Sequence, residues 1–379
     1  MPASADVIVV GGGVIGLSTA WMLRCSGRSV ILVDPAVGEA ASLVAAGMLA
    51  PVTEASFGEE PLLRLNLLAA TRFPEFASEL EGATDCEVGL RREGTLTVAY
   101  DAGDRAALAR LADLRRSYGL EALELDAREC RRLEPLLSPE VRSGVLAVDD
   151  WSVDNRRLLT ALRRAAEMSG VEFVVGRVVR IDADDSGVDG VTVEDGSAMT
   201  ADKVVLAAGA WSAVIDGVPE SVRANVRPVK GQLLRLHIPA ELPLPLTHTV
   251  HATVRGRGVY VVPRADGEIV VGASSEERGF DRTVTVAAVH DLLRDATAVL
   301  PVIGELVMTE MCVGLRPATR DNMPIVTSTD ISGLIVATGH YRNGILQSAI
   351  TADAVLALCD GHELAREWRA LRTAPVGVR

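Results

Sequence analysis

The sequence predicts an α/β protein made of a discontinuous, Rossmann-like domain with a parallel sheet and an α+β domain with a mostly antiparallel sheet. Three observations carry this prediction. The chain has 379 residues, which exceeds the usual size of one hydrophobic core. A strand, a glycine turn, a helix and a second strand follow one another within the first 35 residues. A buried strand, a glycine turn and a long helix return after Gly333, with strand-rich stretches in between.

The start of the chain has the pattern of one βαβ unit. The β-branched apolar run Asp6–Val10 has the composition of a strand that is buried on both faces of a parallel sheet. Glycines occupy positions 11–13, and a helical pattern then runs over Val14–Arg24. A second apolar run, Val30–Val33, ends at Asp34. We expect the crossover between the two strands to be right-handed.

The remaining patterns set the expected domain boundaries. The spacing of apolar residues predicts helices over Glu60–Leu80, Asp104–Tyr118, Asp154–Ser169 and Val286–Leu300. Strand clusters with turn signals span Val171–Leu206 and Val226–Gly272. We expect residues 1–82, 143–218 and 312–379 to form a nucleotide-binding domain, and residues 83–142 and 219–311 to form a substrate-binding domain.

Composition and charge exclude several classes of protein. Hydrophobic residues make up 48% and charged residues 23%, as in a globular chain. The net charge of −13 argues against a nucleic-acid binder, because an acidic surface repels phosphate. No apolar run approaches the ~20 residues of a membrane span, and the N-terminus lacks a signal peptide's basic region. Because the five cysteines are scattered, we expect reduced thiols, no metal site and a cytoplasmic protein.

The glycine turn matches a dinucleotide-binding fingerprint. Gly11, Gly13 and Gly16 follow a strand and open a helix, in the spacing GxGxxG. The N-terminus of that helix would present free N–H groups to a pyrophosphate. Asp34 lies 18 residues after Gly16 at the end of the second strand, where its carboxylate can accept hydrogen bonds from ribose hydroxyls. This pattern indicates dinucleotide binding but does not distinguish NAD from FAD.

Further segments of the chain resemble the D-amino-acid-oxidase-like flavoenzymes, and in particular their glycine oxidase branch. These segments occur in the family's order and cover nearly the whole chain: residues 41–51, 204–212, 228–232, 260–264, 314–319 and 339–346. The resemblance implies FAD, a two-domain fold and oxidation of a C–N bond next to a carboxylate. It also implies a small amino-acid-like substrate and dioxygen as reactants, and leaves a homo-oligomer open.

The resemblance assigns cofactor contacts by position. With the fingerprint residues, the predicted FAD contacts are Gly11, Gly13, Val14, Ile15, Gly16, Asp34, Ala41, Ser42, Ala46, Gly47, Met48, Val178, Gly209, His340, Arg342, Asn343, Gly344, Ile345 and Leu346. The helix that begins at Asn343 and Gly344 would place positive potential beside the flavin and stabilise its anionic reduced form. Cys312 is the nearest candidate for a covalent tether, but its context is that of a buried strand residue, so we predict non-covalent FAD.

The resemblance also assigns the substrate residues. Arg316 matches the family's carboxylate-binding arginine, whose guanidinium can hold a carboxylate through two parallel hydrogen bonds; a structural salt bridge is the alternative. Arg342, Tyr260 and Met48 match residues near the substrate, although a tyrosine in such an apolar run is often a core side chain. The cofactor carries the chemistry, so His340 is interpreted as a positioning residue and not as a general base. The other histidines show no ligand spacing.

Two departures from the family pattern bear on the substrate. Gly258 stands two positions before Tyr260, where the family often has a larger polar or aromatic residue, and residues 347–349 read Gln-Ser-Ala in place of Leu-Ala-Pro. Arg255 and Arg257 lie on what resembles a flexible lid. Together these features predict an N-substituted glycine, with a second acidic group, as substrate. Such an enzyme resembles the glycine oxidase homologues that release a β-amino acid from an N-carboxymethyl precursor in macrolactam pathways. In the alternative, both arginines are solvated loop charges.

The main prediction is an FAD-dependent amine oxidase that converts the glycine part of its substrate to glyoxylate, releases the free amine and reduces dioxygen to hydrogen peroxide. Ordinary glycine oxidation for thiazole synthesis is the nearest alternative. An NAD-linked dehydrogenase is the alternative that the first βαβ unit by itself would allow. A flavin domain that acts on modified RNA is disfavoured by the acidic charge.

Overall fold

The first sheet of the protein includes the strand that leads into the glycine turn. The computed structural model describes residues 3–242, 246–364 and 368. The sheet has the order β17-β18-β11-β1-β2-β8, in which only β17 runs antiparallel to its neighbour. The strands in this order are β1 (Ser4–Val10), β2 (Val30–Asp34), β8 (Glu172–Val175), β11 (Ala198–Leu206), β17 (Ile325–Ser328) and β18 (Leu334–Thr338). An antiparallel hairpin of β9 (Val178–Asp184) and β10 (Gly187–Val193), which pairs with β11, completes the eight-stranded sheet.

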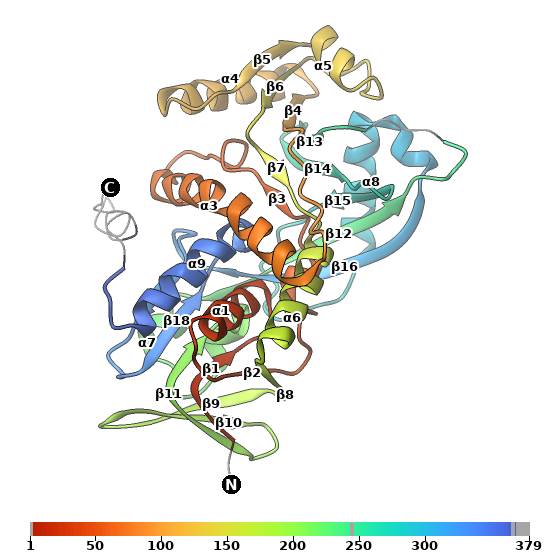
Figure 1. Cartoon of the computed structure of the whole chain (residues 1–379). Helices are drawn as coiled ribbons and strands as arrows, with labels where there is room; N and C mark the ends of the chain where they lie inside the picture. The colour runs from red at the N-terminus through yellow and green to blue at the C-terminus, as the bar shows by residue number, and fades with distance from the viewer. Residues whose placement is uncertain (1–2, 243–245, 365–367, 369–379) are drawn as a thin grey trace.

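Helices cover one face of this sheet and a hairpin covers the other. The helices are α1 (Val14–Cys25), α6 (Asn155–Ser169), α9 (Gly344–Cys359) and α3 (Glu60–Thr84). Helices α1 and α9 contact the strands, α6 packs against α1, and α3 lies across α6 and α9 on the side away from the sheet (Figure 1). Alternate residues of β1 divide between two cores: Val7 and Val9 face the helices, whereas Ile8 and Val10 face the hairpin of β9 (Val178–Asp184) and β10 (Gly187–Val193). Burial on both faces explains why the strands are continuous apolar runs.

The second sheet is mostly antiparallel, as predicted. Its order is β16-β12-β15-β14-β13-β4-β6-β5, and β13 with β4 is its one parallel pair. The strands are β4 (Thr95–Ala99), β5 (Leu123–Asp126), β6 (Ser143–Ala147), β12 (Arg227–His237), β13 (Thr249–Val254), β14 (Arg257–Pro263), β15 (Glu268–Gly272) and β16 (Val307–Ala318). The α/β class with a parallel and a mostly antiparallel sheet is therefore confirmed.

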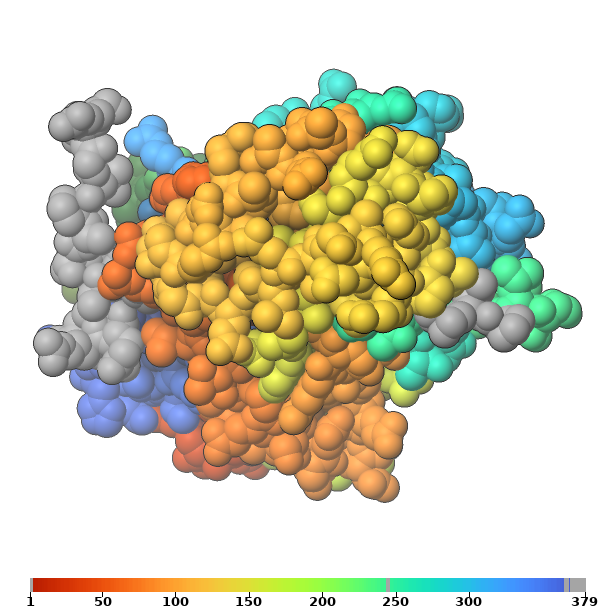
Figure 2. Space-filling model, turned by 90° about the horizontal axis from the view of Figure 1, so that it is seen from above, coloured from red at the N-terminus to blue at the C-terminus, as the bar shows by residue number. Residues whose placement is uncertain are grey.

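Short helices and connections complete the second half of the fold. One face of the second sheet packs on α8 (Val286–Val299), while α4 (Ala102–Ser117) and α5 (Ala127–Leu133) lie by β4, β5 and β6. The segment from α4 to β6 occupies the centre of the face seen in Figure 2. The remaining elements are α2 (Ala41–Val44), β3 (Met48–Leu49), β7 (Trp151–Ser152), α7 (Glu220–Arg223) and two 3-10 helices, η1 (Gly209–Val214) and η2 (Pro301–Glu305).

Most of the predicted helices differ from the observed ones only at their ends, and local capping shows why. Asp154 is the N-cap of α6 and accepts hydrogen bonds from the amides of Arg156 and Arg157. Gly170 ends the same helix in a left-handed conformation with φ +90°. The helix expected from Asp104 begins two residues earlier, at Ala102, because Asp101 and Asp104 form a capping box.

Two strands lie in a different sheet from the one that the proposed domain boundaries imply. Residues 143–147 form β6 and residues 312–318 belong to β16, and both strands lie in the second sheet. Sequence pattern shows where a strand begins, but long-range pairing decides which sheet it joins. Of the C-terminal stretch 365–379 assigned to the nucleotide-binding domain, all except Trp368 lies outside the described residues.

None of the helices in the described part of the chain combines the length and apolar character that crossing a membrane requires.

Candidate active site

A cavity of about 720 Å³ runs between the two sheets. It starts at the turn between β1 and α1, passes the segment from Ala40 to Ala50 and reaches the inner face of β14 and β16. The loop between β18 and α9 closes the far wall. Its volume lies within the roughly 300–1,000 Å³ range of cofactor and ligand pockets. The glycine turn and the inner face of β14 and β16 therefore line one continuous cavity.

The glycine turn at one end of the cavity packs so closely against the backbone that it leaves no room for a Cβ atom at Gly11 or Gly16. Gly11 has φ +107°, and a Cβ there would lie 2.5 Å from the carbonyl oxygen of Ala207. A Cβ on Gly16 would lie 1.8 Å from the carbonyl oxygen of Gly11, so this glycine permits close packing of α1 and does not line the cavity. The carboxylate of Asp34 accepts hydrogen bonds from the amides of Gly12 and Ala36, each at 2.7 Å, and lines the cavity.

The segment from Ala40 to Gly47 forms the side wall, and buried polar side chains hold it in place. Ser42 Oγ accepts a hydrogen bond of 3.0 Å from the amide of Val14 at the start of α1. Asn155 donates to the carbonyl oxygens of Ser42 and Leu43, both at 2.8 Å. The buried guanidinium of Arg264 donates to the carbonyl oxygen of Ala46 at 2.6 Å. These contacts tie the wall to α6 and to the second sheet.

The loop before α9 contributes a buried polar group and a helix N-terminus. Asn343 is the N-cap residue of α9, and its Nδ2 is buried without a hydrogen-bond partner among the described residues. His340 is 2% exposed, and its Nε2 lies 2.9 Å from Thr351 Oγ1. Burial lowers the pKa of His340 to about 3, so its ring is neutral near pH 7. His340, Asn343 and Gly344 line the cavity.

These features fit an FAD molecule. The glycine turn and the start of α1 suit a pyrophosphate, and Asp34 lies where a ribose would bind. The unpartnered Asn343 Nδ2 is a buried donor at the opposite end, where the N-terminus of α9 adds positive potential suited to the pyrimidine edge of a flavin. Cys312, on β16, is buried in a small apolar cluster and is not among the cavity-lining residues.

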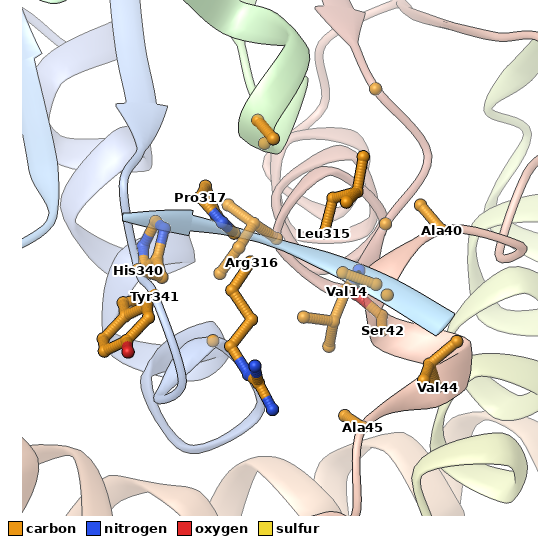
Figure 3. A pocket seen from close by; sticks show the side chains of 18 of the residues that line it. Val14, Ala40, Ser42, Val44, Ala45, Leu315, Arg316, Pro317, His340 and Tyr341 are labelled. Atoms are coloured by element: carbon orange, nitrogen blue, oxygen red, sulfur yellow. Dashed lines mark hydrogen bonds between the residues drawn. The ribbon is translucent and has the colours of Figure 1, made fainter. Parts of the chain in front are cut away.

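Arg316 extends into the centre of the cavity from β16 (Figure 3). It lies between His340 and Tyr341 on one side and the wall of Val14, Ser42 and Val44 on the other. Its Nη1 donates to the carbonyl oxygen of Ser274 at 3.0 Å, which leaves further guanidinium donors for a ligand. The position is that of a cation which can hold an anionic group inside a partly closed space.

Tyr260 lies on the same wall, and two glycines make room for both side chains. Burial raises the pKa of Tyr260, and the nearby Arg316 guanidinium opposes that shift, so the hydroxyl is protonated near pH 7. A Cβ on Gly231 would lie 2.2 Å from Arg316 Nη1. A Cβ on Gly272 would lie 2.3 Å from Cζ of Tyr260. The positions of these two glycines on β12 and β15 therefore clear the space that Arg316 and Tyr260 occupy.

Arg342 lines the cavity but is already paired with carboxylates. Its Nε lies 2.6 Å from Glu54 Oε2, and its Nη2 donates to Glu59 Oε2 at 3.2 Å. The Glu54 carboxylate is the main cause that raises the pKa of Arg342. Tyr341, next to it, has φ +47°, and its amide donates to the carbonyl oxygen of Pro317 at 2.8 Å. The loop before α9 is thereby joined to the strand that carries Arg316.

Four predicted site residues do not line the cavity. Gly16 and Leu346 are buried behind the wall. Arg255 lies in the tight turn between β13 and β14, and Arg257 is the first residue of β14, in place of the flexible lid expected there. Both oxygens of Asp104 accept amide hydrogens from that turn, at 2.8 Å each, and Arg257 forms an ion pair of 2.9 Å with Asp295. This placement outside the cavity agrees with the alternative in which both arginines are loop charges and do not bind the substrate.

The other predicted site residues do line it. They are Gly11, Gly13, Val14, Ile15, Asp34, Ala41, Ser42, Ala46, Gly47, Met48, Val178, Gly209, Tyr260, Arg316, His340, Arg342, Asn343, Gly344 and Ile345. Gly258 also lines the cavity, and no heavy atom lies within 4 Å of a Cβ built there. Gln347 does not; it is buried and donates to Asn66 Oδ1 at 2.7 Å.

Sequence reasoning missed several residues of the site. Glu54 and His251 line the cavity, and Gly231 and Gly272 shape it. Glu54 follows the resembling segment 41–51 by three positions, and that proximity was an available signal. His251 lies within a strand pattern with no motif around it, and only its pairing with Tyr260 across β13 and β14 brings it to the site.

The fold and the cavity define a dinucleotide-binding protein whose cavity also contains a cationic side chain, Arg316, that can bind an anionic ligand. The chain matches the FAD-dependent oxidoreductase family over residues 6–358, and it belongs to that family. FAD, and not NAD, is thus the dinucleotide that the glycine turn binds. The chain is similar to the glycine oxidase of Geobacillus kaustophilus, with 34% identity over 364 residues that cover 95% of this chain and 94% of that protein.

Solved structures lead to the same branch of the family. The glycine oxidase structure from Geobacillus kaustophilus superposes with a TM-score of 0.89 and 32% identity, covering 99% of this chain and all of that one. An iminodiacetate oxidase from Chelativorans sp. BNC1 superposes with a TM-score of 0.83 and 26% identity, covering 94% of this chain and 96% of that one.

Some relatives are longer proteins. The bifunctional protein ThiO/ThiG of Synechocystis sp. is 34% identical over 356 residues, which are 93% of this chain and 51% of that protein. The chain thus spans about half the length of such relatives.

Proposed function

We propose that this protein is an FAD-dependent oxidase of glycine-type amino acids: the substrate is oxidised to an imine, which water hydrolyses to glyoxylate and ammonia or a free amine, and dioxygen is reduced to hydrogen peroxide. The observation that carries the proposal is the position of Arg316. Its guanidinium stands in a cavity whose other end has the features of an FAD site, close to the loop that begins α9. A carboxylate held there has its α-carbon next to the place that the flavin would occupy.

The residues of the chain act by binding and orientation. Arg316 binds the substrate carboxylate, and the protonated Tyr260 hydroxyl donates a second hydrogen bond to it. The neutral ring of His340, held by Thr351, shapes the wall by the flavin without adding charge. When bound, FAD supplies the chemistry, accepting a hydride from the substrate and passing the electrons to dioxygen.

The names of the relatives favour glycine itself as substrate. Several similar proteins are called glycine oxidase, and others ThiO/ThiG. On this evidence, ordinary glycine oxidation is the first candidate, and a role in thiazole synthesis would follow from it. The proposal extends to this chain the substrate that the names of those proteins state.

A second candidate, an N-substituted glycine, is favoured by the space at Gly258. The missing side chain leaves the cavity open on the same strand as Tyr260, two residues away and on the same face. A substituent on the substrate nitrogen would fit this space. The similarity to an iminodiacetate oxidase supports the candidate, because iminodiacetate is itself an N-carboxymethyl glycine.

A substrate panel tests both candidates. Purified enzyme is assayed for peroxide release with glycine, N-methylglycine, longer N-alkylglycines and N-carboxymethyl amino acids. The proposal predicts turnover of at least one member and glyoxylate as product. Turnover of none of them, by protein that carries FAD, would contradict it.

Gly258→Phe distinguishes the two candidates. A phenyl group fills the open space, so oxidation of N-alkylglycines should fall by about tenfold or more, whereas oxidation of glycine should change little. The measurement is kcat/KM for glycine and N-ethylglycine in both proteins. Equal losses for the two substrates would show that the space at Gly258 does not receive the substituent.

A further inference from the structure

His251 is a polar ring on the cavity wall with an unexplained position. It lies on β13 directly opposite Tyr260 on β14, and both side chains line the cavity. Opposed residues on antiparallel strands have Cβ atoms about 4.5–5.5 Å apart. A ligand whose carboxylate is held by Arg316 and Tyr260 therefore places its next atoms within reach of the His251 ring.

The ring lacks a hydrogen-bond partner in the protein. No hydrogen bond joins the His251 side chain to another residue in the described part of the chain, and its Nδ1 is buried. Buried polar atoms in folded proteins nearly always have a partner, either in the protein or in a bound molecule. An unpartnered imidazole beside the carboxylate clamp points to a contact with the ligand.

The surroundings keep this ring neutral. Burial lowers the pKa of His251 below its ordinary value, Glu54 opposes the shift, and the nearby guanidinium groups add to it. The polar and charged groups around the ring are Tyr260 on β14, Thr97 on β4, Arg115 on α4, Glu54 and Arg342. Glu54 is engaged with Arg342 at 2.6 Å. A neutral imidazole has one nitrogen free to accept a hydrogen bond.

We propose that His251 is a positioning residue that accepts a hydrogen bond from the substrate amine, an inference that rests on the proposed function. The α-carbon releases a hydride readily only when the nitrogen carries a lone pair. A secondary amine in its free-base form has a single N–H. Holding that N–H on His251 therefore fixes the direction of the lone pair and of the N-substituent together, while Arg316 and Tyr260 hold the carboxylate.

The test separates the amine contact from binding of the carboxylate. FAD-loaded wild-type, His251→Phe and His251→Gln proteins are mixed anaerobically with N-methylglycine, and the limiting rate of flavin reduction is measured. Binding of acetate, which has the carboxylate but no hydrogen-bond donor in place of the amine, is measured by the change in flavin absorbance. His290→Gln, an exposed histidine on α8, is the matched control.

For His251→Phe we expect the limiting reduction rate to fall by about tenfold or more, with acetate affinity within twofold of wild type, because only the amine loses a partner. His251→Gln keeps an acceptor that does not titrate. It should recover most of the rate and lack the part of the acid-side decline, below about pH 6.5, that arises from protonation of the imidazole.

Unchanged reduction by His251→Phe would overturn the proposal, as would an equal loss of acetate binding, which would mean that the ring only shapes the wall. A Gln variant as slow as the Phe variant would also overturn it. If wild-type enzyme is reduced by no glycine-type compound, the proposed function fails before the variants are compared, so the two failures are distinguishable.

Discussion

At the scale of the residue, the site consists of a few polar side chains that have room because glycines lie next to them. Arg316 lines the cavity, donates from Nη1 to the carbonyl oxygen of Ser274 and lies beside the hydroxyl of Tyr260, and no carboxylate forms an ion pair with it among the described residues. Arg342, the other predicted substrate arginine, is held by Glu54 and Glu59. The two arginines therefore differ in availability: Arg316 is free to bind a carboxylate, and Arg342 is neutralised.

Replacing Arg316 tests this difference. For Arg316→Ala we expect kcat/KM to fall by roughly a hundredfold or more, since two charge-assisted hydrogen bonds to the carboxylate are lost. FAD should stay bound, because Arg316 lies away from the glycine turn that suits the pyrophosphate. Arg316→Lys should recover only part of the loss, since an ammonium group cannot form the paired contact. Wild-type turnover by the alanine variant would refute the assignment of the clamp.

At the scale of the element, the site depends on which strands are neighbours. Arg316 on β16 pairs with Val229 on β12, so Gly231 lies diagonally across from it. The space for the guanidinium is therefore made by a strand that is about 85 residues away in the sequence. The hairpin of β13 and β14 places His251 against Tyr260 in the same way.

Gly231→Ala tests the contribution of β12. Its Cβ would collide with the guanidinium of Arg316, the mobile end of a flexible side chain, so the arginine should move while the fold remains. We expect KM to rise by about tenfold and the thermal midpoint to change little.

Gly82→Ala is the matched control for this substitution, because no atom lies within 4 Å of a Cβ at that position of α3. It should leave KM unchanged and stabilise the protein by about 0.5–1 kcal/mol. Equal KM values for Gly231→Ala and wild type would show that Arg316 does not need the space at Gly231.

At the scale of the whole molecule, burial of ionisable groups makes stability depend on pH. His340 has a folded-state pKa of about 3, against an ordinary value of about 6.5 in the unfolded chain. Between these values the unfolded state binds more protons, so the free energy of unfolding rises with pH and falls as the solution is acidified.

The comparison of wild type with His340→Asn measures this effect. Between pH 7 and pH 4 the wild type should lose about 3 kcal/mol more stability than the variant. Burial raises the pKa of Asp150 to about 6, which acts in the opposite direction, but Asp150 is present in both proteins and cancels in the difference. Denaturant unfolding at each pH supplies the values, and His290→Gln is the control. Parallel pH profiles for the two proteins would contradict the buried, neutral state of His340.

The sequence by itself determined the cofactor end of this protein. Gly11, Gly13, Gly16 and Asp34 act through local geometry, because a turn, a helix start and a strand end are set by residues close together in the chain. The order of the resembling segments likewise predicted both sheets and the position of Arg316 in the cavity.

Only the tertiary structure decided the rest of the substrate end. It placed Glu54 on Arg342, His251 opposite Tyr260 and Gly231 beside Arg316, and it placed Arg255 and Arg257 outside the cavity. The physical reason is that strand pairing joins residues that are distant in the chain. A one-residue change of register would turn the strand residues His251 and Arg316 to the opposite face of the sheet.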